Sequence, residues 1–322
     1  MIGGHMKKVL LALVLAVAFS AAACAVTYLN APDDSSAVSG KYTTMSIGAA
    51  ASGMGNAYLG ASKGAVSIYW NPAGIAGIKN NESEWNMFFA HNMALMNMTI
   101  ENIAVAKSFK DAGVFAASVS YYGSDSMDMY SIDSGSNPVD LNRTFRAYAA
   151  GGSIAYANTL DKDIDYGITA KYFYDNIADD STSVIAFDIG LRYFFSPLKG
   201  LSFNIAAKNL GGQLGGDTMD KEVGFGALYT ADIEKWIVTA AYDVIGKIRN
   251  VALHRAGLEI KTPYYVTLRS GYFSDNNLIE SGFSNVTFGL GINIDQKYAV
   301  DFSFEPYGEL GNTYKTSFSA DF

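Results

Sequence analysis

The last residues of the chain alternate strictly between two kinds of side chain. One set of alternate positions holds Tyr314, Thr316, Phe318, Ala320 and Phe322, and the other holds Lys315, Ser317, Ser319 and Asp321. Successive side chains of a β-strand point to opposite faces, so this pattern predicts a strand with one apolar and one polar face. The same alternation recurs over 286–294 and 298–305, and farther upstream over 185–193 and 201–205. The chain is therefore predicted to fold as a β protein.

The N-terminus reads as a secretory signal. Lys7 and Lys8 precede an apolar run and then a zone of small residues, SAAACA, which suits cleavage after Ala23 or Ala25. The apolar run is too short to span a bilayer comfortably. We predict a signal peptide over 1–25, in which 1–5 are an extended start or an expression remnant.

Cys24 is the one cysteine in the sequence, and it has two interpretations. It could be the lipidated first residue of a lipoprotein, although Ala21 stands where such signals usually carry a larger aliphatic residue. Otherwise the mature chain has no cysteine, which excludes disulfides, thiolate metal sites and cysteine nucleophiles.

Composition narrows the class of β protein. The chain is 49% hydrophobic and 13% aromatic but only 17% charged, and no later stretch is long and apolar enough for a membrane helix. An exported chain of this kind is either a secreted β protein or a membrane β-barrel. Without Lys7 and Lys8 the formal charge moves from −8 to −10, so no nucleic-acid partner is expected.

The residues on the polar faces favour the membrane barrel. The outer face of a soluble sandwich is usually rich in charge, whereas these faces are mostly Gly, Ala, Ser, Thr and Asn, as suits a filled lumen. A Lys or Arg on the lipid face costs about 2–4 kcal/mol at mid-membrane, and the charges in these strands fall on the polar face. The face on which Arg255 lies is ambiguous, because the alternation in its segment can be assigned to the inner and outer faces in either of two ways.

Counting the segments predicts an all-β antiparallel transmembrane barrel of about fourteen strands over 84–322. The strands are expected near 84–92, 98–109, 113–122, 143–158, 164–176, 183–195, 200–209, 221–231, 235–245, 250–261, 264–273, 283–295, 297–306 and 313–322. Short turns follow the even strands, and longer loops, such as 123–142 and 176–182, mostly follow the odd ones. Outer-membrane barrels place the short turns and both termini in the periplasm.

The segment from Ser46 to Ile78 differs from the rest. It is crowded with Gly and Ala, carries the single charge of Lys63, and ends in an aromatic pair followed by Asn71-Pro72-Ala73-Gly74. Such small residues let backbone pack against backbone. We predict that 26–83 form an N-terminal segment and a hatch, or plug, that enters the lumen from the periplasmic side.

Two parts of this segment resemble a known family. Gly53-Met54-Gly55-Asn56-Ala57-Tyr58-Leu59-Gly60-Ala61 and Ile68-Tyr69-Trp70-Asn71-Pro72-Ala73-Gly74 are similar to the N-terminal signature of the PorV/PorQ proteins and their relatives in the FadL superfamily. The resemblance implies a fourteen-stranded outer-membrane barrel closed by a hatch. FadL proteins pass hydrophobic molecules through a hatch shift and a lateral opening, whereas PorV acts as a shuttle in type IX secretion. The short chain and Lys63-Gly64, where relatives often have an acidic residue, depart from the fatty-acid transporters.

The candidate site residues fall into four groups. Asn71, Pro72, Ala73 and Gly74 are the expected hatch or gate, since Pro72 lacks a backbone donor and makes the chain turn. Tyr58, Tyr69 and Trp70 are the expected ligand contacts, with a simple sealing plug as the alternative. Eight charged residues are expected to face the lumen and pair across it: Asp188, Arg192, Lys208, Asp243, Glu259, Arg269, Asp301 and Glu305. Tyr314, Phe318 and Phe322 form the expected C-terminal assembly signal.

No catalytic, metal or cofactor site is expected. Gly60-Ala61-Ser62-Lys63-Gly64 matches a nucleophile elbow but lacks the α/β context of that motif. His91 and His254 lie far apart in the sequence. The sequence thus predicts a non-enzymatic protein of the bacterial outer membrane that passes small hydrophobic molecules passively, or alternatively a component of type IX secretion. Its expected partners are outer-membrane lipid, the barrel-assembly machinery, and either hydrophobic small molecules or secreted proteins.

Overall fold

A computed structural model describes residues 38–79, 84–247, 252–274, 285–295, 297–308 and 311–322. The predicted signal peptide and Cys24 lie outside these residues. Among the described residues, no helix is long and apolar enough to cross a membrane.

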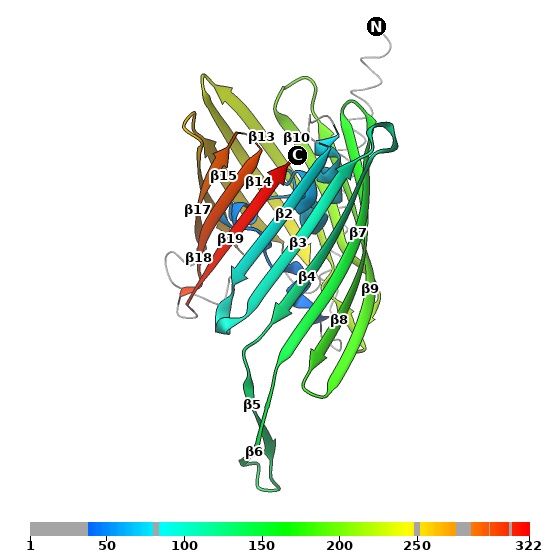
Figure 1. The fold of residues 1–322 in the computed structure, drawn as a ribbon, viewed down its shortest axis with the longest axis vertical. Helices are drawn as coiled ribbons and strands as arrows, with labels where there is room; N and C mark the ends of the chain where they lie inside the picture. The colour runs from blue at the N-terminus through cyan, green and yellow to red at the C-terminus, as the bar shows by residue number, and fades with distance from the viewer. Residues whose placement is uncertain (1–37, 80–83, 248–251, 275–284, 296, 309–310) are drawn as a thin grey trace.

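Fourteen antiparallel strands close into a barrel, as the alternation predicts (Figure 1). The strands are β2 (Trp85–Met93), β3 (Thr99–Ser108), β4 (Val114–Gly123), β7 (Ala147–Asp161), β8 (Ile164–Ile177), β9 (Asp180–Phe194), β10 (Leu201–Gly211), β13 (Glu222–Ile233), β14 (Trp236–Lys247), β15 (Leu253–Lys261), β16 (Val266–Phe273), β17 (Val286–Ile294), β18 (Tyr298–Pro306) and β19 (Asn312–Asp321). The last strand closes the ring by pairing with the first, with Phe318 opposite Phe89. Closure removes the unpaired strand edges that lipid could not satisfy.

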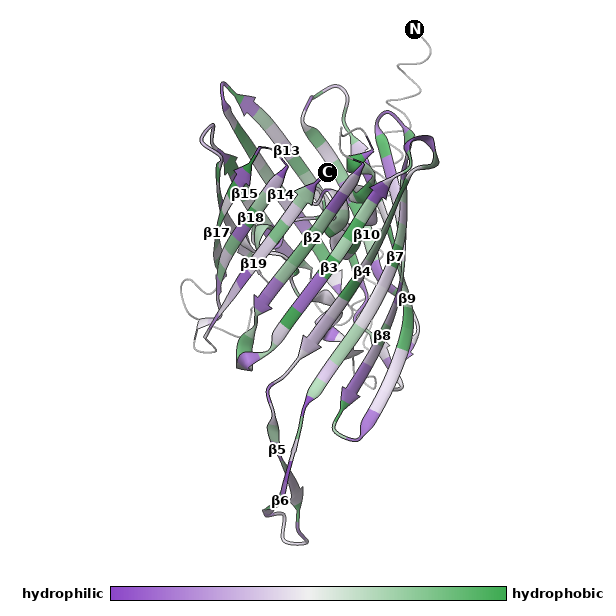
Figure 2. Ribbon diagram, in the orientation of Figure 1, coloured by the Kyte–Doolittle hydropathy of each residue, from purple (hydrophilic) through white to green (hydrophobic). Residues whose placement is uncertain are grey.

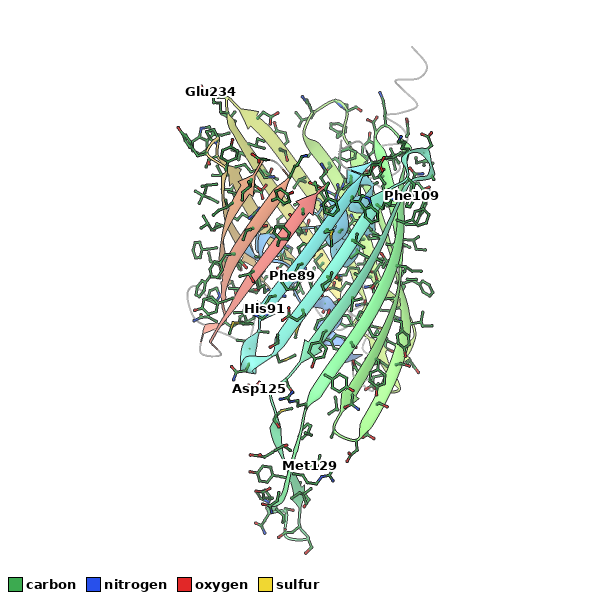
Figure 3. All side chains as sticks on the ribbon, in the orientation of Figure 1. Phe89, His91, Phe109, Asp125, Met129 and Glu234 are labelled. Atoms are coloured by element: carbon green, nitrogen blue, oxygen red, sulfur yellow. The ribbon has the colours of Figure 1, made fainter. Side chains whose placement is uncertain are left out.

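The connections define two ends of the barrel. We call "turn end" the end with the connections β3–β4, β7–β8, β9–β10, β13–β14, β15–β16 and β17–β18, and "loop end" the opposite one. Figure 3 shows Phe109 and Glu234 at the turn end, whereas Asp125 and Met129 lie beyond the loop end. The first and last barrel strands also begin and end at the turn end, where the backbone N–H of Trp85 donates to the carbonyl of Phe322.

Two predicted loops are wrong. The segment 123–142 contains most of a hairpin, β5 (Met127–Ile132) and β6 (Pro138–Phe145), so the strand expected from 143 begins instead at Ala147. Val139 and Leu141 alternate with polar residues and so extend the pattern of β7 outward, but β6 pairs with β5 rather than with the barrel, with Val139 opposite Ser131. The predicted loop 176–182 is a turn over residues 178–179, because β8 and β9 pair as far as Ile177 and Asp180.

The two faces of the wall divide as expected. Along β19, Tyr314 and Phe318 are exposed on the outside, whereas Lys315 and Ser317 are buried inside. Figure 2 shows apolar and hydrophilic residues alternating along the strands. Arg255 is buried on the inner face, which settles its phase. The outer face thus offers the apolar surface that a membrane requires.

The N-terminal segment lies inside the barrel (Figure 1). It consists of β1 (Val38–Ser39) and short helical turns: η1 (Lys41–Thr44), α2 (Ala49–Gly53), η2 (Gly64–Val66), α3 (Ser67–Trp70) and η3 (Pro72–Ile78). At the loop end β1 joins β12 (Asp217–Met219), which pairs with β11 (Gln213–Leu214), both from the β10–β13 connection. We call residues 38–79 the hatch.

The hatch and the wall share an apolar core. Ile68, Ile75 and Ile78 of the hatch are almost fully buried against inward-facing alanines of β3, β4 and β7. The small wall residues leave room for these larger side chains. Burying one such side chain contributes about 1.5–3 kcal/mol, so this contact is a main source of hatch stability.

Candidate functional site

The turn at Asn71 is fixed by its own side chain. Its Oδ1 accepts from the backbone N–H of Ala73 at 3.1 Å, while its Nδ2 donates to the carbonyls of Leu59 at 3.2 Å and Leu191 at 3.4 Å. Pro72 then begins η3, where its missing N–H costs nothing. Asn71 therefore joins two parts of the hatch and the wall strand β9.

A pair of wall glycines receives this turn. Gly167 of β8 and Gly190 of β9 lie opposite one another in the ladder. A Cβ at Gly190 would collide with the Asn71 side chain, and a Cβ at Gly167 would collide with the Pro72 backbone. Only glycine at both wall positions lets Asn71 and Pro72 lie flat against the barrel. Gly74 is equally confined, since a Cβ there would come within 2.5 Å of the Ser62 carbonyl.

A second glycine contact holds the other side of the hatch. Gly53 approaches Gly289 of β17 so closely that a Cβ on Gly53 would lie 2.8 Å from the Gly289 Cα. Gly55, whose φ of 60° is left-handed, lies against Gly271 of β16. Gly257 pairs with Gly271 and touches Met54. The hatch thus meets the wall, backbone to backbone, at two separate places.

Buried charges of the wall bind the hatch directly. Asp243 accepts from the backbone N–H of Leu59 at 3.0 Å, and Arg192 Nη2 donates to the Ser62 carbonyl at 2.6 Å. Glu305 accepts from Ser52 at 3.0 Å and from Asn56 at 3.3 Å. These wall residues are at least nine-tenths buried. They lie inside the barrel and contact hatch atoms, and Glu305 also forms the expected kind of ion pair, with Lys315 of β19.

The other lumen charges form ion pairs with residues on adjacent strands or, for Arg269 and Asp301, on strands separated by β17. Arg269 binds both Glu259 and Asp301 at 2.7 Å, and Asp188 pairs with Lys171 at 2.6 Å. Lys208 binds Glu222 at 3.1 Å. The pairing compensates the cost of removing these groups from water. Sequence reasoning did not single out Lys171 or Glu222, although both lie on the inner phase of their strands.

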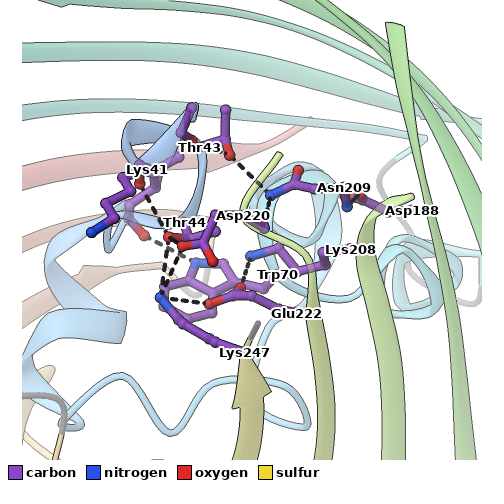
Figure 4. Close-up of polar contacts among 12 residues, drawn as sticks. Lys41, Thr43, Thr44, Trp70, Asp188, Lys208, Asn209, Asp220, Glu222 and Lys247 are labelled. Atoms are coloured by element: carbon purple, nitrogen blue, oxygen red, sulfur yellow. Dashed lines mark hydrogen bonds and ion pairs between the residues drawn. The ribbon is translucent and has the colours of Figure 1, made fainter. Parts of the chain in front are cut away.

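Near the loop end, the hatch joins a network of such pairs (Figure 4). Lys247 binds Glu222 at 3.0 Å and Asp220 at 3.6 Å, and it donates to Thr44 of η1 at 3.1 Å. Asp220 in turn accepts from the Thr44 hydroxyl at 3.0 Å. The charges therefore tie the first turn of the hatch to the wall and to the β10–β13 connection.

An aromatic cluster lies beside this network. The ring of Tyr42 in η1 packs 4.8 Å from Tyr122 and 5.7 Å from Phe173, measured between centroids. Leu214 and Met219 from the β10–β13 connection complete the cluster. The hatch thus carries apolar surface to the loop end of the lumen, which no sequence motif indicated.

The three aromatic residues expected to contact ligand occupy different surroundings. Trp70 is buried, donates from Nε1 to the Ile47 carbonyl at 3.0 Å, and packs edge-on against Tyr58 at 5.6 Å. Tyr69 donates its hydroxyl to the carbonyl of Ile103 at 3.1 Å. Of the three, only Tyr58 lines the cavity described next.

A cavity of about 390 Å³ lies at the turn end, between the hatch and the wall. Ile47, Tyr58 and Val66 of the hatch and Phe88 of β2 contribute apolar lining. Charged residues of both signs surround this apolar part, among them Arg269 and its two carboxylate partners. Transport predicts a continuous apolar pocket that runs from the outer loops to the hatch. This cavity is not such a pocket, because it lies at the turn end and has charged residues in its lining.

The remaining expected features are placed as follows. Tyr314 and Phe318 project outward from β19, and Phe322 is exposed at the turn end. His91 and His254 lie on the outer wall, bonded to Glu101 at 2.6 Å and to Tyr242 at 2.7 Å. Within the described ranges, no three His, Cys, Asp or Glu side chains are arranged to hold a metal ion.

No protein-family model matches the sequence, and no curated protein matches it. Solved structures do match. The toluene transporter TodX of Pseudomonas putida superposes with a TM-score of 0.58 at 11% identity, over 85% of this chain and 98% of TodX. The toluene transporter TbuX of Ralstonia pickettii gives 0.56 at 12% identity, over 85% of this chain and 98% of TbuX. The monoaromatic hydrocarbon channel CymD superposes with a TM-score of 0.56 at 12% identity, over 86% of this chain and 97% of CymD.

The likeness is one of fold. It confirms the predicted all-β fourteen-stranded barrel. In this chain an N-terminal segment with short helices occupies that barrel. The finer resemblance to PorV/PorQ proteins has no counterpart among these matches.

Proposed function

We propose that the protein is a bacterial outer-membrane channel that passes small hydrophobic molecules passively, with residues 38–79 as its gate. The observation that carries this proposal is a lumen closed by one separable segment. The hatch joins the barrel strands only through the connection that leads to β2, and it meets the rest of the wall through non-covalent contacts. A non-enzymatic conduit needs such a movable closure and no catalytic group.

The fold matches support the substrate class. The matched proteins are named as toluene transporters and monoaromatic hydrocarbon channels. Tyr58 and Trp70, whose edge-to-face pair lies within the hatch, are the proposed aromatic contacts for an apolar molecule. Asn71, Pro72, Ala73 and Gly74 are the proposed gate, because they fix the turn that seats on Gly167 and Gly190.

The membrane orientation follows from the same architecture. With the turn end in the periplasm, the longer connections and the β5–β6 hairpin lie outside the cell. The apolar outer wall contacts outer-membrane lipid, and Tyr314, Phe318 and Phe322 are the proposed signal for the barrel-assembly machinery.

A disulfide lock tests gating directly. The backbone N–H of Ala49 in α2 donates to the Ser317 hydroxyl of β19 at 3.1 Å, so these two neighbouring positions are chosen for a cysteine pair. In proteoliposomes, Ala49→Cys/Ser317→Cys is expected to lose toluene uptake when oxidised and to regain it with dithiothreitol. The two single-cysteine variants are the matched controls. Uptake that is unchanged by the closed disulfide would refute hatch gating.

A second candidate function is a PorV/PorQ-type component of type IX secretion, favoured by the β5–β6 hairpin. Ile132 and Tyr130 of this hairpin are 77% and 57% exposed, and the hairpin extends well beyond the barrel (Figure 1). It therefore does not cap the lumen. Replacing 127–145 by a short turn is expected to abolish binding of a secreted protein under this alternative, and to leave toluene uptake intact under the first.

A further inference from the structure

The cavity at the turn end has a cationic rim. Lys63 of the hatch, Lys261 at the end of β15 and Lys297 just before β18 line it, and all three side chains are exposed. Arg269 adds a fourth cation deeper inside. The rim therefore combines one cation from the hatch with two from the wall.

The carboxylates of this cavity already have partners. Glu259 and Asp301 accept from Arg269, Glu259 also pairs with Lys261 at 3.5 Å, and Asp321 accepts from Asn86 Nδ2 at 2.8 Å. Four cationic and three anionic side chains line the cavity, which leaves an excess of one positive charge. Lys297 makes no ion pair with any residue that the structure describes.

The interior of the cavity is suited to a compact apolar group. Tyr58, Val66 and Phe88 contribute apolar surface within reach of the lysine rim. A volume of about 390 Å³ falls at the lower end of the range of about 300–1,000 Å³ found for small-molecule pockets. It suits a ring system better than a long chain.

We propose that this cavity binds a compact organic anion, an apolar ring system bearing a carboxylate, sulfonate or phosphate group, from the periplasmic side. The ring lies against Tyr58 and Phe88, and the anionic group lies among Lys63, Lys261 and Lys297. Because the rim is exposed with the hatch in place, the ligand enters without any opening of the channel.

Such a ligand would also hold the hatch closed. It contacts Lys63 of the hatch and Lys297 of the wall together, so it binds the closed arrangement better than one in which the hatch has moved. A ligand with that differential affinity shifts the equilibrium toward the closed state. This consequence rests on the proposed gating function, whereas the binding site itself does not.

Two fluorescent probes test the site. Anilinonaphthalene sulfonate and phenylnaphthylamine share one aromatic body, and only the first is anionic. With the full chain in lipid nanodiscs, we expect tighter binding of the sulfonate. The double variant Lys63→Gln/Lys297→Gln should weaken sulfonate binding roughly fivefold and leave the neutral probe unchanged. Lys199→Gln, an exposed lysine of another turn that does not line the cavity, is the matched control and should behave as wild type.

The outcomes are decisive for the site. Equal affinity for the two probes, or an equal loss for both in the double variant, would overturn the proposal. Lys297→Gln alone provides a second variant outside the hatch, and it should produce part of the same selective loss.

Uptake measurements test the closing effect separately. In proteoliposomes, the sulfonate is expected to slow toluene uptake by wild type but not by the double variant. Uptake that is unaffected by bound sulfonate would overturn the link to the hatch. If toluene does not enter at all, the proposed transport function fails, while the binding measurement still decides the site.

Discussion

The hatch is held on its two sides by different kinds of contact. On the first side, which we call the alanine flank, Ile68, Ile75 and Ile78 pack against the alanines of β3, β4 and β7. On the second, the polar flank, residues between Ser52 and Ser62 bond to Asp243, Glu305 and Arg192, in addition to two small apolar clusters around Met54 and Leu59. Apolar burial has no preferred direction, whereas each hydrogen bond fixes one position of the hatch.

The difference suggests how a closed lumen could open. Hydrogen bonds of the polar flank can be exchanged for bonds to water, so that each of these bonds to a charged group contributes about 1.5–3 kcal/mol net. Exposing the isoleucines of the alanine flank has no such compensation. We therefore expect the polar flank to detach first, with the alanine flank as the hinge, and the following predictions test this order.

The largest effect is expected from the alanine flank. Ile75 is fully buried, and Ile75→Ala should lower the free energy of unfolding by about 2–5 kcal/mol, because it leaves a cavity in the shared core. Urea titration of the protein in detergent, followed by tryptophan fluorescence, measures the change. Ile154→Ala, at a position 68% exposed on the outer wall, is the control and should change stability far less.

The next effect is expected at the boundary of the two flanks. Gly190→Val places a side chain where Asn71 lies, and overpacking should destabilise the seated hatch by about 3 kcal/mol. Protease cleavage within 38–79 and increased ion conductance in planar bilayers would report a displaced hatch. Gly152→Val is the control, since a Cβ there meets only the Ser118 carbonyl at 3.7 Å. Equal behaviour of the two variants would contradict the seating role of Gly190.

A smaller effect is expected on the polar flank. Asp243→Ala removes the acceptor of the Leu59 N–H and should destabilise the seated hatch by about 1.5 kcal/mol. Asp243→Asn, which keeps an acceptor oxygen, should restore part of the lost stability of the seated hatch. Hydrogen exchange of residues 52–62 should accelerate in Asp243→Ala while 68–78 stay protected. Faster exchange in both segments would show that the flanks do not separate.

The smallest effect belongs to a region that touches neither flank. The backbone N–H groups of Asn137 and Gly135 donate to Asp133 at the hairpin tip and hold the pKa of that carboxyl below its usual range. The Asp133 carboxylate therefore stabilises the hairpin tip at pH values above the ordinary pKa of aspartate, about 3.9. This stabilisation is lost as the pH falls through the lower pKa that Asp133 has in the folded protein. Amide exchange across 133–137 should accelerate in that acid range, with Asp133→Asn removing the dependence. Unchanged exchange would contradict this role of Asp133.

Much of the wall was predictable because its signal is local. Alternation with period two assigns each strand and its inner face from a few consecutive residues, as it did for Tyr314 to Phe322. Prediction went wrong for 123–142, where a hairpin continues the alternation of the barrel, because pattern alone does not say which strand is the partner. Arg255 stayed ambiguous for a related reason, since its segment fits two phases.

The candidate site was only partly predictable. The sequence Asn71-Pro72 predicts a turn from local residues alone, and the structure has that turn. Their seat on Gly167 and Gly190 joins positions about a hundred residues apart, and glycine in a strand does not by itself reveal what approaches it. The same holds for Lys247, whose partners Glu222 and Thr44 of the hatch come together only in the folded barrel.

The sequence by itself determined the strands, their inner and outer faces and the presence of a compact Gly/Ala-rich segment, since these depend on neighbouring residues and on backbone geometry. The tertiary structure alone decided how that segment seats. Which glycines receive it, which charges bind it and where a cavity remains all depend on contacts between distant parts of the chain, which form only when the barrel closes.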